Sequence, residues 1–356
     1  MKAGLVLYGD LNARSGGYFY DQQLVNHLRR EGDQVQVFSL TEKDHFVSHL
    51  FDNWQWGFWQ QLATADLDVL LQDELNHLSL FLGNCWLKSR ANYPIVSIIH
   101  HLRLNEARGT CANQFSRLVE SIYLRTVDAV ICNSPTTKKE VEKISTVPKS
   151  IVAFPGNDHI EGGQGSSESV SKSGFNILFV GSVIPRKGVH TLIQAIRRLS
   201  DEKVHLDLVG SLKSNPEYVA SIRQLIQAND LDESVTIHGR VEDEDLQMFY
   251  ASCDVLAVPS SYEGLGIVYL EAMKHGKPVI ATKNGGTNDI ITHGKNGYLV
   301  EHCNVSELTS RLQYLSKKIE LRQQMGEQSR QMAQNHPTWR ESMSEVRTFL
   351  QTLAYP

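Results

Sequence analysis

Short, continuous apolar runs alternate with segments of helical periodicity along this chain. Because the runs are apolar at nearly every position, they predict strands that are buried on both faces of a sheet. In the first half they cover residues 5–8, 35–38, 69–71, 95–99, 128–132 and 151–154. In the second half they cover residues 176–180, 205–209, 235–239, 254–258, 278–281 and 297–300.

Amphipathic segments fill most of the intervals between these runs. They predict helices at residues 16–30 and 265–273, helices that begin near 135, 189, 243 and 306, and a last helix at 339–353. Alternating strands and helices are typical of doubly wound α/β domains with a parallel sheet. A stretch rich in Gly, Ser and Glu at 156–174 separates the two halves and predicts a linker. We therefore expect two Rossmann-like domains, at residues 1–160 and 174–337.

The most informative segment joins the predicted strand at 254–258 to the helix at 265–273. Glu263, Gly264, Leu265 and Gly266 form the turn between them, and Glu271 follows within the helix. Glycines allow a tight turn and close approach of a ligand, and a helix start favours a phosphate group. Eight residues of helix rise by at most roughly 12 Å at about 1.5 Å per residue. This span predicts a nucleotide sugar with its sugar at Glu263, its diphosphate over the turn and its ribose at Glu271.

A second phosphate element is predicted where Arg186 and Lys187 precede the helix that begins near residue 189. Cations at a helix start are unfavourable partners for the helix dipole, because that end is already positive. They become favourable when an anion binds between them and the helix. The alternative for Arg186 and Lys187 is a solvated pair on the surface. The alternative for the two acids is that Glu263 caps the helix and Glu271 lies on its exposed face.

The spacing of Glu263 and Glu271, after Pro259-Ser260, resembles the E-x7-E signature of family 4 glycosyltransferases. This family has the GT-B fold, in which two Rossmann-like domains face one another across a cleft. The segment 181–188 is similar to the family's diphosphate element, with Ser182 in place of its arginine and Lys187 in place of its lysine. Arg186 can supply the second charge, and which cation contributes more stays open.

The resemblance also implies roles for four residues outside these two elements. It places Gly16 and Gly17 beside the donor diphosphate, Gly210 at the nucleotide and Val241 at the base. It further implies that the helix in 338–356 crosses back and completes the first domain.

Two histidines, His100 and His101, follow the predicted strand at 95–99. The resemblance implies that one of them lies near the donor sugar, and His100 is the better match by its position. A histidine in such a place can equally be a structural residue. With Glu263 and Lys187, His100 completes the expected catalytic set.

The family implies sugar transfer with retention of the anomeric configuration and without a metal or other cofactor. Asp66-Leu67-Asp68 and Asp243-Glu244-Asp245 match the D-x-D pattern of metal-dependent transferases. The first pair precedes a strand and the second lies in a first helical turn, where acids are favoured. We expect neither to bind a metal.

The composition excludes other classes of partner and location. The formal net charge of −5 offers no basic surface for nucleic acid, and five scattered cysteines indicate a reducing compartment. We expect a cytoplasmic protein, with peripheral membrane contact left open.

The aromatic residues 51–59 include three of the five tryptophans. We interpret them as a packed cluster under a long loop. An acceptor platform and an interfacial anchor remain alternatives.

Two other functions remain as alternatives to a glycosyltransferase. A pyridine-nucleotide oxidoreductase is disfavoured because neither opening strand precedes a full G-x-G-x-x-G. A non-catalytic nucleotide-sugar-binding module would keep the same fold. The sequence leaves the base (UDP, GDP or ADP), the sugar and the acceptor (glycan, lipid or small molecule) open.

Overall fold

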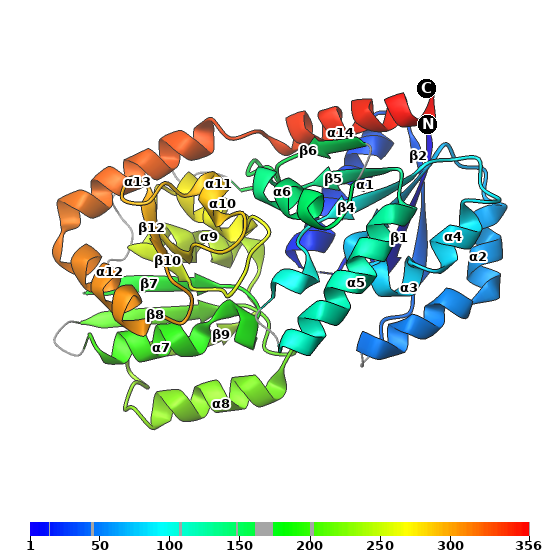
Figure 1. Cartoon of the computed structure of the whole chain (residues 1–356). Coiled ribbons are helices and arrows are strands. Elements are labelled where there is room, and N and C mark those ends of the chain that lie inside the picture. The colour runs from blue at the N-terminus through cyan, green and yellow to red at the C-terminus, as the bar shows by residue number, and fades with distance from the viewer. Residues whose placement is uncertain are drawn as a thin grey trace. The chain divides into compact units, whose positions relative to one another are not determined.

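The computed structural model describes residues 1–13, 15–43, 46–106, 109–146, 149–160, 174–199 and 203–355. They form two compact units, Met1–Gly156 with Pro337–Pro356 and Asn157–His336. Each unit holds one six-stranded sheet, and all strand pairs in both sheets are parallel. The predicted doubly wound α/β architecture is therefore confirmed (Figure 1). Most of the predicted linker, residues 161–173, lies outside the described residues.

The first sheet has the strand order β2-β1-β3-β4-β5-β6. Its strands are Lys2–Tyr8 (β1), Gln34–Leu40 (β2), Val69–Asp73 (β3), Ile95–Ile99 (β4), Ala129–Cys132 (β5) and Lys149–Val152 (β6). The strands β3, β4 and β5 are buried at every position, as the continuous apolar runs predict. β2 pairs with one side of β1, and the strands that follow it in sequence continue from β3 on the other side. The carboxyl ends of β1 and β3 therefore form the topological switch point.

The helices of the first unit cover this sheet and carry its site residues. They are Gly16–Arg30 (α1), Phe46–Trp54 (η1), Trp56–Ala63 (α2), Glu74–Asn76 (η2), His77–Leu80 (α3), Gly83–Leu87 (α4), Arg103–Asn105 (η3), Thr110–Thr126 (α5), Pro135–Ile144 (α6) and Trp339–Ala354 (α14). The helix α1 has the predicted bounds, because Ser15 caps its start and Gly32 follows its end with a φ of 84°.

The C-terminal helix α14 packs against α1 (Figure 1). A capping box of Thr338 and Glu341 begins the helix. The ring of Trp339 contacts Tyr20 at a centroid distance of 5.6 Å, and Arg347 pairs with Asp33 at 2.7 Å. The last helix of the sequence thereby contributes core and ion-pair contacts to the first unit.

The second sheet has the order β12-β11-β10-β7-β8-β9. Its strands are Phe175–Val180 (β7), Val204–Val209 (β8), Val235–Gly239 (β9), Val255–Val258 (β10), Val279–Thr282 (β11) and Gly297–Val300 (β12). Its helices are Pro185–Lys187 (η4), Val189–Arg197 (α7), Pro216–Gln227 (α8), Asp243–Ser252 (α9), Ile267–Lys274 (α10), Thr287–Ile290 (α11), Val305–Lys317 (α12) and Ile319–Gln334 (α13).

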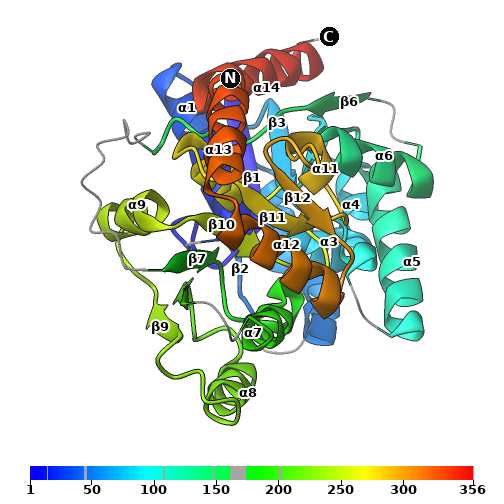
Figure 2. The ribbon, with the colours of Figure 1, turned by 90° about the vertical axis from the view of Figure 1, so that its left-hand side faces the viewer.

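The helices α7 and α8 lie together in both views of the chain (Figure 1 and Figure 2), and α10 packs against α13. The strand order reverses between β7 and β10, so the loops that follow these two strands are neighbours.

None of the helices in the described ranges has the length and apolar character needed to cross a bilayer.

Candidate active site

The two loops at the switch point of the second sheet lie against one another. The amide of Ser261 donates to the carbonyl of Arg186 at 2.7 Å. Gly188 has a φ of 70°, and a Cβ there would lie 2.2 Å from the carbonyl oxygen of Pro259. Only a glycine allows the two backbones to approach this closely. The loop after β7 and the loop after β10 therefore form one structure.

This contact brings both predicted cations to the predicted carboxylate. Lys187 Nζ lies 2.5 Å from Glu263 Oε1, and Arg186 Nη1 lies 3.7 Å from the same oxygen. Ser260 Oγ donates to that oxygen at 2.5 Å, and Arg186 also donates to the carbonyl of Tyr262 at 2.8 Å. Lys187 is thus the closer of the two cations to Glu263.

Opposite charges keep this buried site ionised. Burial raises the pKa of Glu263, but Lys187, Arg186 and the hydrogen bonds together outweigh it and hold the pKa at about 2. Burial also lowers the pKa of Lys187, and the attraction of Glu263 opposes that shift. An anion that entered this site would find Lys187 already desolvated and both cations held by the protein.

Glycines determine the backbone path around Glu263. Gly285 has a φ of 85°, and a Cβ there would lie 1.9 Å from the Glu263 carbonyl oxygen. Gly266 has a φ of 90° and is the N-cap residue before α10, while Gly264 is half-buried. The side chain of Leu265 is only 1% exposed, so a ligand would meet its backbone rather than its side chain.

Glu271 lies in α10, as predicted, and both of its oxygens have side-chain partners. Tyr250 Oη donates to Oε2 at 2.5 Å, and His159 Nε2 lies 3.0 Å from Oε1. The sequence analysis missed both partners. Tyr250 stands on α9 and His159 lies far from Glu271 in sequence, so no local pattern connects them.

The other two predicted donor residues also lie at the carboxyl edge of the second sheet. Gly210 follows β8 with a φ of 147°, and a Cβ there would lie 2.0 Å from the carbonyl oxygen of Gly181. Val241 is half-buried between β9 and α9. Both positions are at the edge where a ligand of a doubly wound sheet binds.

In the first unit the structure brings together Gly17 and His100. A Cβ at Gly17 would lie 3.1 Å from His100 Cδ2, so the glycine leaves room for the imidazole. Gly16 is the first residue of α1. The imidazole also packs against the ring of Tyr20 in a T-shaped arrangement, with a centroid distance of 5.3 Å.

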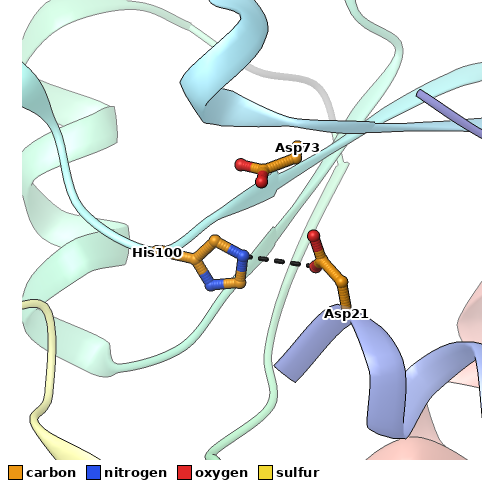
Figure 3. A group of neighbouring side chains, drawn as sticks. All are labelled: Asp21, Asp73 and His100. Carbon is orange, nitrogen blue, oxygen red and sulfur yellow. Dashed lines mark hydrogen bonds and ion pairs between the residues drawn. The ribbon is translucent and has the colours of Figure 1, made fainter. Parts of the chain in front are cut away.

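The sequence analysis missed two carboxylates beside His100. Asp21 Oδ1 lies 3.2 Å from His100 Nε2, and Asp73, the last residue of β3, lies close to both (Figure 3). Burial raises the pKa of Asp21 to about 8 and that of Asp73 to about 7, and it lowers the pKa of His100. These three residues are the one group in the described ranges whose arrangement could take a metal ion.

The side chains of Glu74 and Asn133 also hold the backbone after β4. Glu74 accepts from the amides of His100 at 2.6 Å and His101 at 3.2 Å, and Asn133 donates to the His100 carbonyl at 2.7 Å. The ring of His101 pairs with Glu106 at 3.0 Å. The structure therefore gives His100 the more buried and more constrained position.

The two D-x-D segments lie where the sequence predicts. Asp66 pairs with the side chain of Lys2, and Asp68 accepts from the backbone amide of Lys2 at 2.6 Å. Asp243 and Asp245 lie in the first turn of α9.

The interpretation of the aromatic stretch was wrong in part. The stretch lies in η1 and α2, and Trp59 is buried as expected of a packed cluster, but Phe51, Trp54 and Trp56 are 70%, 68% and 55% exposed. The exposed rings lie outside the core cluster because η1 and α2 are short and present only one face to it.

Two family models match this chain. Residues 20–156 match the model "Glycosyltransferase Family 4", and residues 166–332 match "Glycosyl transferases group 1". An uncharacterized glycosyltransferase of Methanocaldococcus jannaschii is 31% identical over 229 residues, which cover 64% of this chain and 60% of that protein. A D-inositol 3-phosphate glycosyltransferase of Pseudarthrobacter chlorophenolicus is 32% identical over 165 residues, 45% of this chain and 39% of that protein. The chain thus spans less than two thirds of these curated relatives.

Solved structures share the fold over almost the whole chain. Sucrose-phosphate synthase from Thermosynechococcus elongatus superposes with a TM-score of 0.86 at 21% identity, over 99% of this chain and 98% of that one. Anabaena HepE in complex with UDP-glucose superposes with a TM-score of 0.80 at 20% identity, over 99% and 100%. The predicted GT-B fold is confirmed.

Proposed function

We propose that this chain, which belongs to the glycosyltransferases of the GT-B fold, transfers a sugar from a nucleoside diphosphate sugar to an acceptor hydroxyl. The observation that carries the proposal is the pairing of Lys187 and Arg186 with Glu263 where the loops after β7 and β10 meet. Two adjacent cations suit a diphosphate, and a carboxylate that stays ionised suits the hydroxyls of a sugar. The family matches support the same reaction class.

In the proposed reaction the bond between the anomeric carbon and the donor phosphate breaks. The acceptor oxygen forms the new bond to that carbon, and its proton passes to the leaving diphosphate. Arg186 and Lys187 stabilise the negative charge that develops on the diphosphate, while Glu263 offsets positive charge on the sugar ring. Because these cations can stabilise the leaving group, we expect activity without a metal, and the family resemblance supports retention of the anomeric configuration.

Glu271 is proposed to bind the ribose hydroxyls, and Gly16, Gly17, Gly210 and Val241 to line the nucleotide. A complex of Anabaena HepE with UDP-glucose makes UDP-sugars the first donors to test. The name of the Pseudarthrobacter relative adds sugar-like polyols to the acceptors worth testing. Trp54 and Trp56 are exposed and could hold an acceptor ring by stacking.

A thermal-shift panel tests the donor site. UDP, GDP, ADP and NAD are added with EDTA to wild type and to Lys187→Ala. A ligand at about 100 times its Kd adds roughly 2.7 kcal/mol of stability, which is easily measured. We expect a shift with one nucleoside diphosphate that Lys187→Ala reduces to about half or less. A shift with NAD alone would favour an oxidoreductase and contradict the proposal.

Turnover separates an enzyme from a binding module. Incubation of donor and an acceptor library with wild type should release nucleoside diphosphate and form a glycoside whose anomeric configuration, read by NMR, matches the donor. Glu263→Ala should bind the nucleotide but form no product. Equal product from both proteins would remove Glu263 from the mechanism, and nucleotide binding without any product would support the module.

A further inference from the structure

Asp21 and Asp73 are both fully buried beside His100. An oxygen of each carboxyl group and a nitrogen of the imidazole lie within 4.8 Å of one another (Figure 3). Asp21 Oδ1 faces His100 Nε2, and Asp73 Oδ1 accepts the Leu75 amide at 2.9 Å. The remaining oxygens, Asp21 Oδ2 and Asp73 Oδ2, are buried without a hydrogen-bond partner. Each therefore lacks a donor that a buried carboxylate normally has.

Neither carboxyl group has a lysine or arginine partner among the described residues. The titratable groups that face the pair are His100, Glu74 and the phenols of Tyr8, Tyr18, Tyr20 and Tyr123. None of these supplies a permanent positive charge. Two adjacent buried carboxylates cannot both stay ionised in such surroundings, because burial and mutual repulsion both oppose it.

We propose that Asp21 and Asp73 share one proton between their Oδ2 atoms, and that Asp21 thereby positions His100 with Nε2 protonated and Nδ1 as a hydrogen-bond acceptor. One proton gives both unpartnered oxygens a hydrogen bond. It also leaves Asp21 Oδ1 unprotonated, so that this oxygen accepts from Nε2–H. The raised pKa values of about 8 for Asp21 and about 7 for Asp73 agree with a proton retained at neutral pH.

The tautomer determines what His100 offers to a ligand. Nδ1 has no hydrogen-bond partner among the described residues, so this nitrogen remains for a substrate hydroxyl. If a protonated Asp21 instead donated a hydrogen bond to an unprotonated Nε2, Nδ1 would carry the ring hydrogen and would donate it to an oxygen acceptor. The consequence for a sugar hydroxyl rests on the proposed function, whereas the shared proton and the tautomer do not.

Imidazole ¹⁵N NMR of the ligand-free protein tests the tautomer directly. His100→Gln identifies the His100 signals among those of the 14 histidines. From pH 6 to 7.5 we expect protonated Nε2 and unprotonated Nδ1 in wild type and in Asp73→Asn, whose amide replaces the protonated carboxyl group. Asp21→Ala should lose this preference. Asp33 is a buried carboxylate that pairs with Arg347 instead, so Asp33→Asn should keep the His100 tautomer.

Three results would overturn the proposal. Two come from the NMR spectra: protonated Nδ1 in wild type, or an unchanged His100 signal in Asp21→Ala. The third comes from a metal titration: stoichiometric binding of Zn²⁺ or Mn²⁺ that Asp73→Asn abolishes, since a cation would then take the place of the shared proton.

Thermal melts provide a second measurement that needs only the isosteric variant. The folded pKa of each acid is raised, so its contribution to stability is full below the unfolded pKa and is lost as pH rises through about 7 to 8. Wild type should therefore lose Tm between pH 6 and 9 more steeply than Asp73→Asn. Equal slopes would contradict the shared proton.

Kinetics then test the positioning role. Asp21→Ala should lower kcat/KM about tenfold or more, and the control Asp33→Asn should change it by less than about threefold. Unchanged turnover in Asp21→Ala would overturn the positioning role. Absence of turnover in wild type would instead count against the proposed function, and the NMR result would still decide the proton pair.

Discussion

At the scale of single residues, the charge on Glu263 is sustained by neighbours from two separate loops. Lys187 comes from the loop after β7, whereas Ser260 precedes Glu263 in its own loop. The pair also links the two proposed roles, because the cation that would bind phosphate is held by the carboxylate that would bind sugar. Removing Lys187 should therefore weaken nucleotide binding, whereas removing the charge of Glu263 should not.

Lys187→Ala should weaken binding of the favoured nucleoside diphosphate by about 10- to 100-fold, since a hydrogen bond to a charged group contributes about 1.5–3 kcal/mol. Glu263→Gln frees Lys187 and should bind the same ligand as tightly as wild type or more tightly. Calorimetric titration measures both affinities. A large loss in Glu263→Gln would mean that the carboxylate, rather than the cation, holds the nucleotide.

Tyr250 orients Glu271 through its hydroxyl, at 2.5 Å from Oε2. Tyr250→Phe leaves a buried carboxylate oxygen without that donor, and we expect KM for the donor to rise several-fold with kcat little changed. Such a pattern indicates lost binding rather than lost chemistry. Tyr93→Phe, which removes a buried hydrogen bond to the Leu62 carbonyl in the first unit, is the matched control and should leave KM unchanged.

At the scale of elements, loops that carry the site depend on glycines with positive φ. Gly285 and Gly294 have similar φ values of 85° and 80°, but only Gly285 lies against another backbone. Gly294→Ala should cost about 1–2 kcal/mol of unfolding free energy through its φ alone. Gly285→Ala adds a clash with the Glu263 carbonyl and should cost more. It should also reduce turnover, because Glu263 must move.

Urea denaturation compares the two glycine variants with wild type. Equal losses would show that the close approach at Gly285 relaxes without cost. The comparison is informative because both substitutions add the same methyl group at the same kind of backbone position.

At the scale of the whole molecule, one unit is built from both ends of the sequence. Trp339 begins α14, is 5% exposed and packs against Phe19 and Tyr20 of α1. The first unit therefore depends on the last helix for part of its core. Substitutions in α14 therefore test how much this helix contributes to the stability of the first unit.

Trp339→Ala should destabilise the first unit by about 3–5 kcal/mol, as expected for a large buried aromatic side chain. Trp54→Ala, at a residue that is 68% exposed, should change stability by less than about 0.5 kcal/mol. Chemical denaturation followed by tryptophan fluorescence and circular dichroism measures both. A small effect of Trp339→Ala would mean that α14 contributes little to the core.

The sequence by itself determined the order of the strands and of α1, α6, α7, α9, α10, α12 and α14, because burial and backbone geometry repeat locally along the chain. The strand at 95–99 and the helix at 16–30 have their predicted bounds, and Glu263, Glu271 and Lys187 lie in the predicted elements. Only the tertiary structure decided which side chains meet. Lys187 reaches Glu263, Tyr250 reaches Glu271, and Asp21 reaches His100 across 76, 21 and 79 residues of sequence. Such contacts follow from the strand order of each sheet, which places distant loops side by side and which no local pattern encodes.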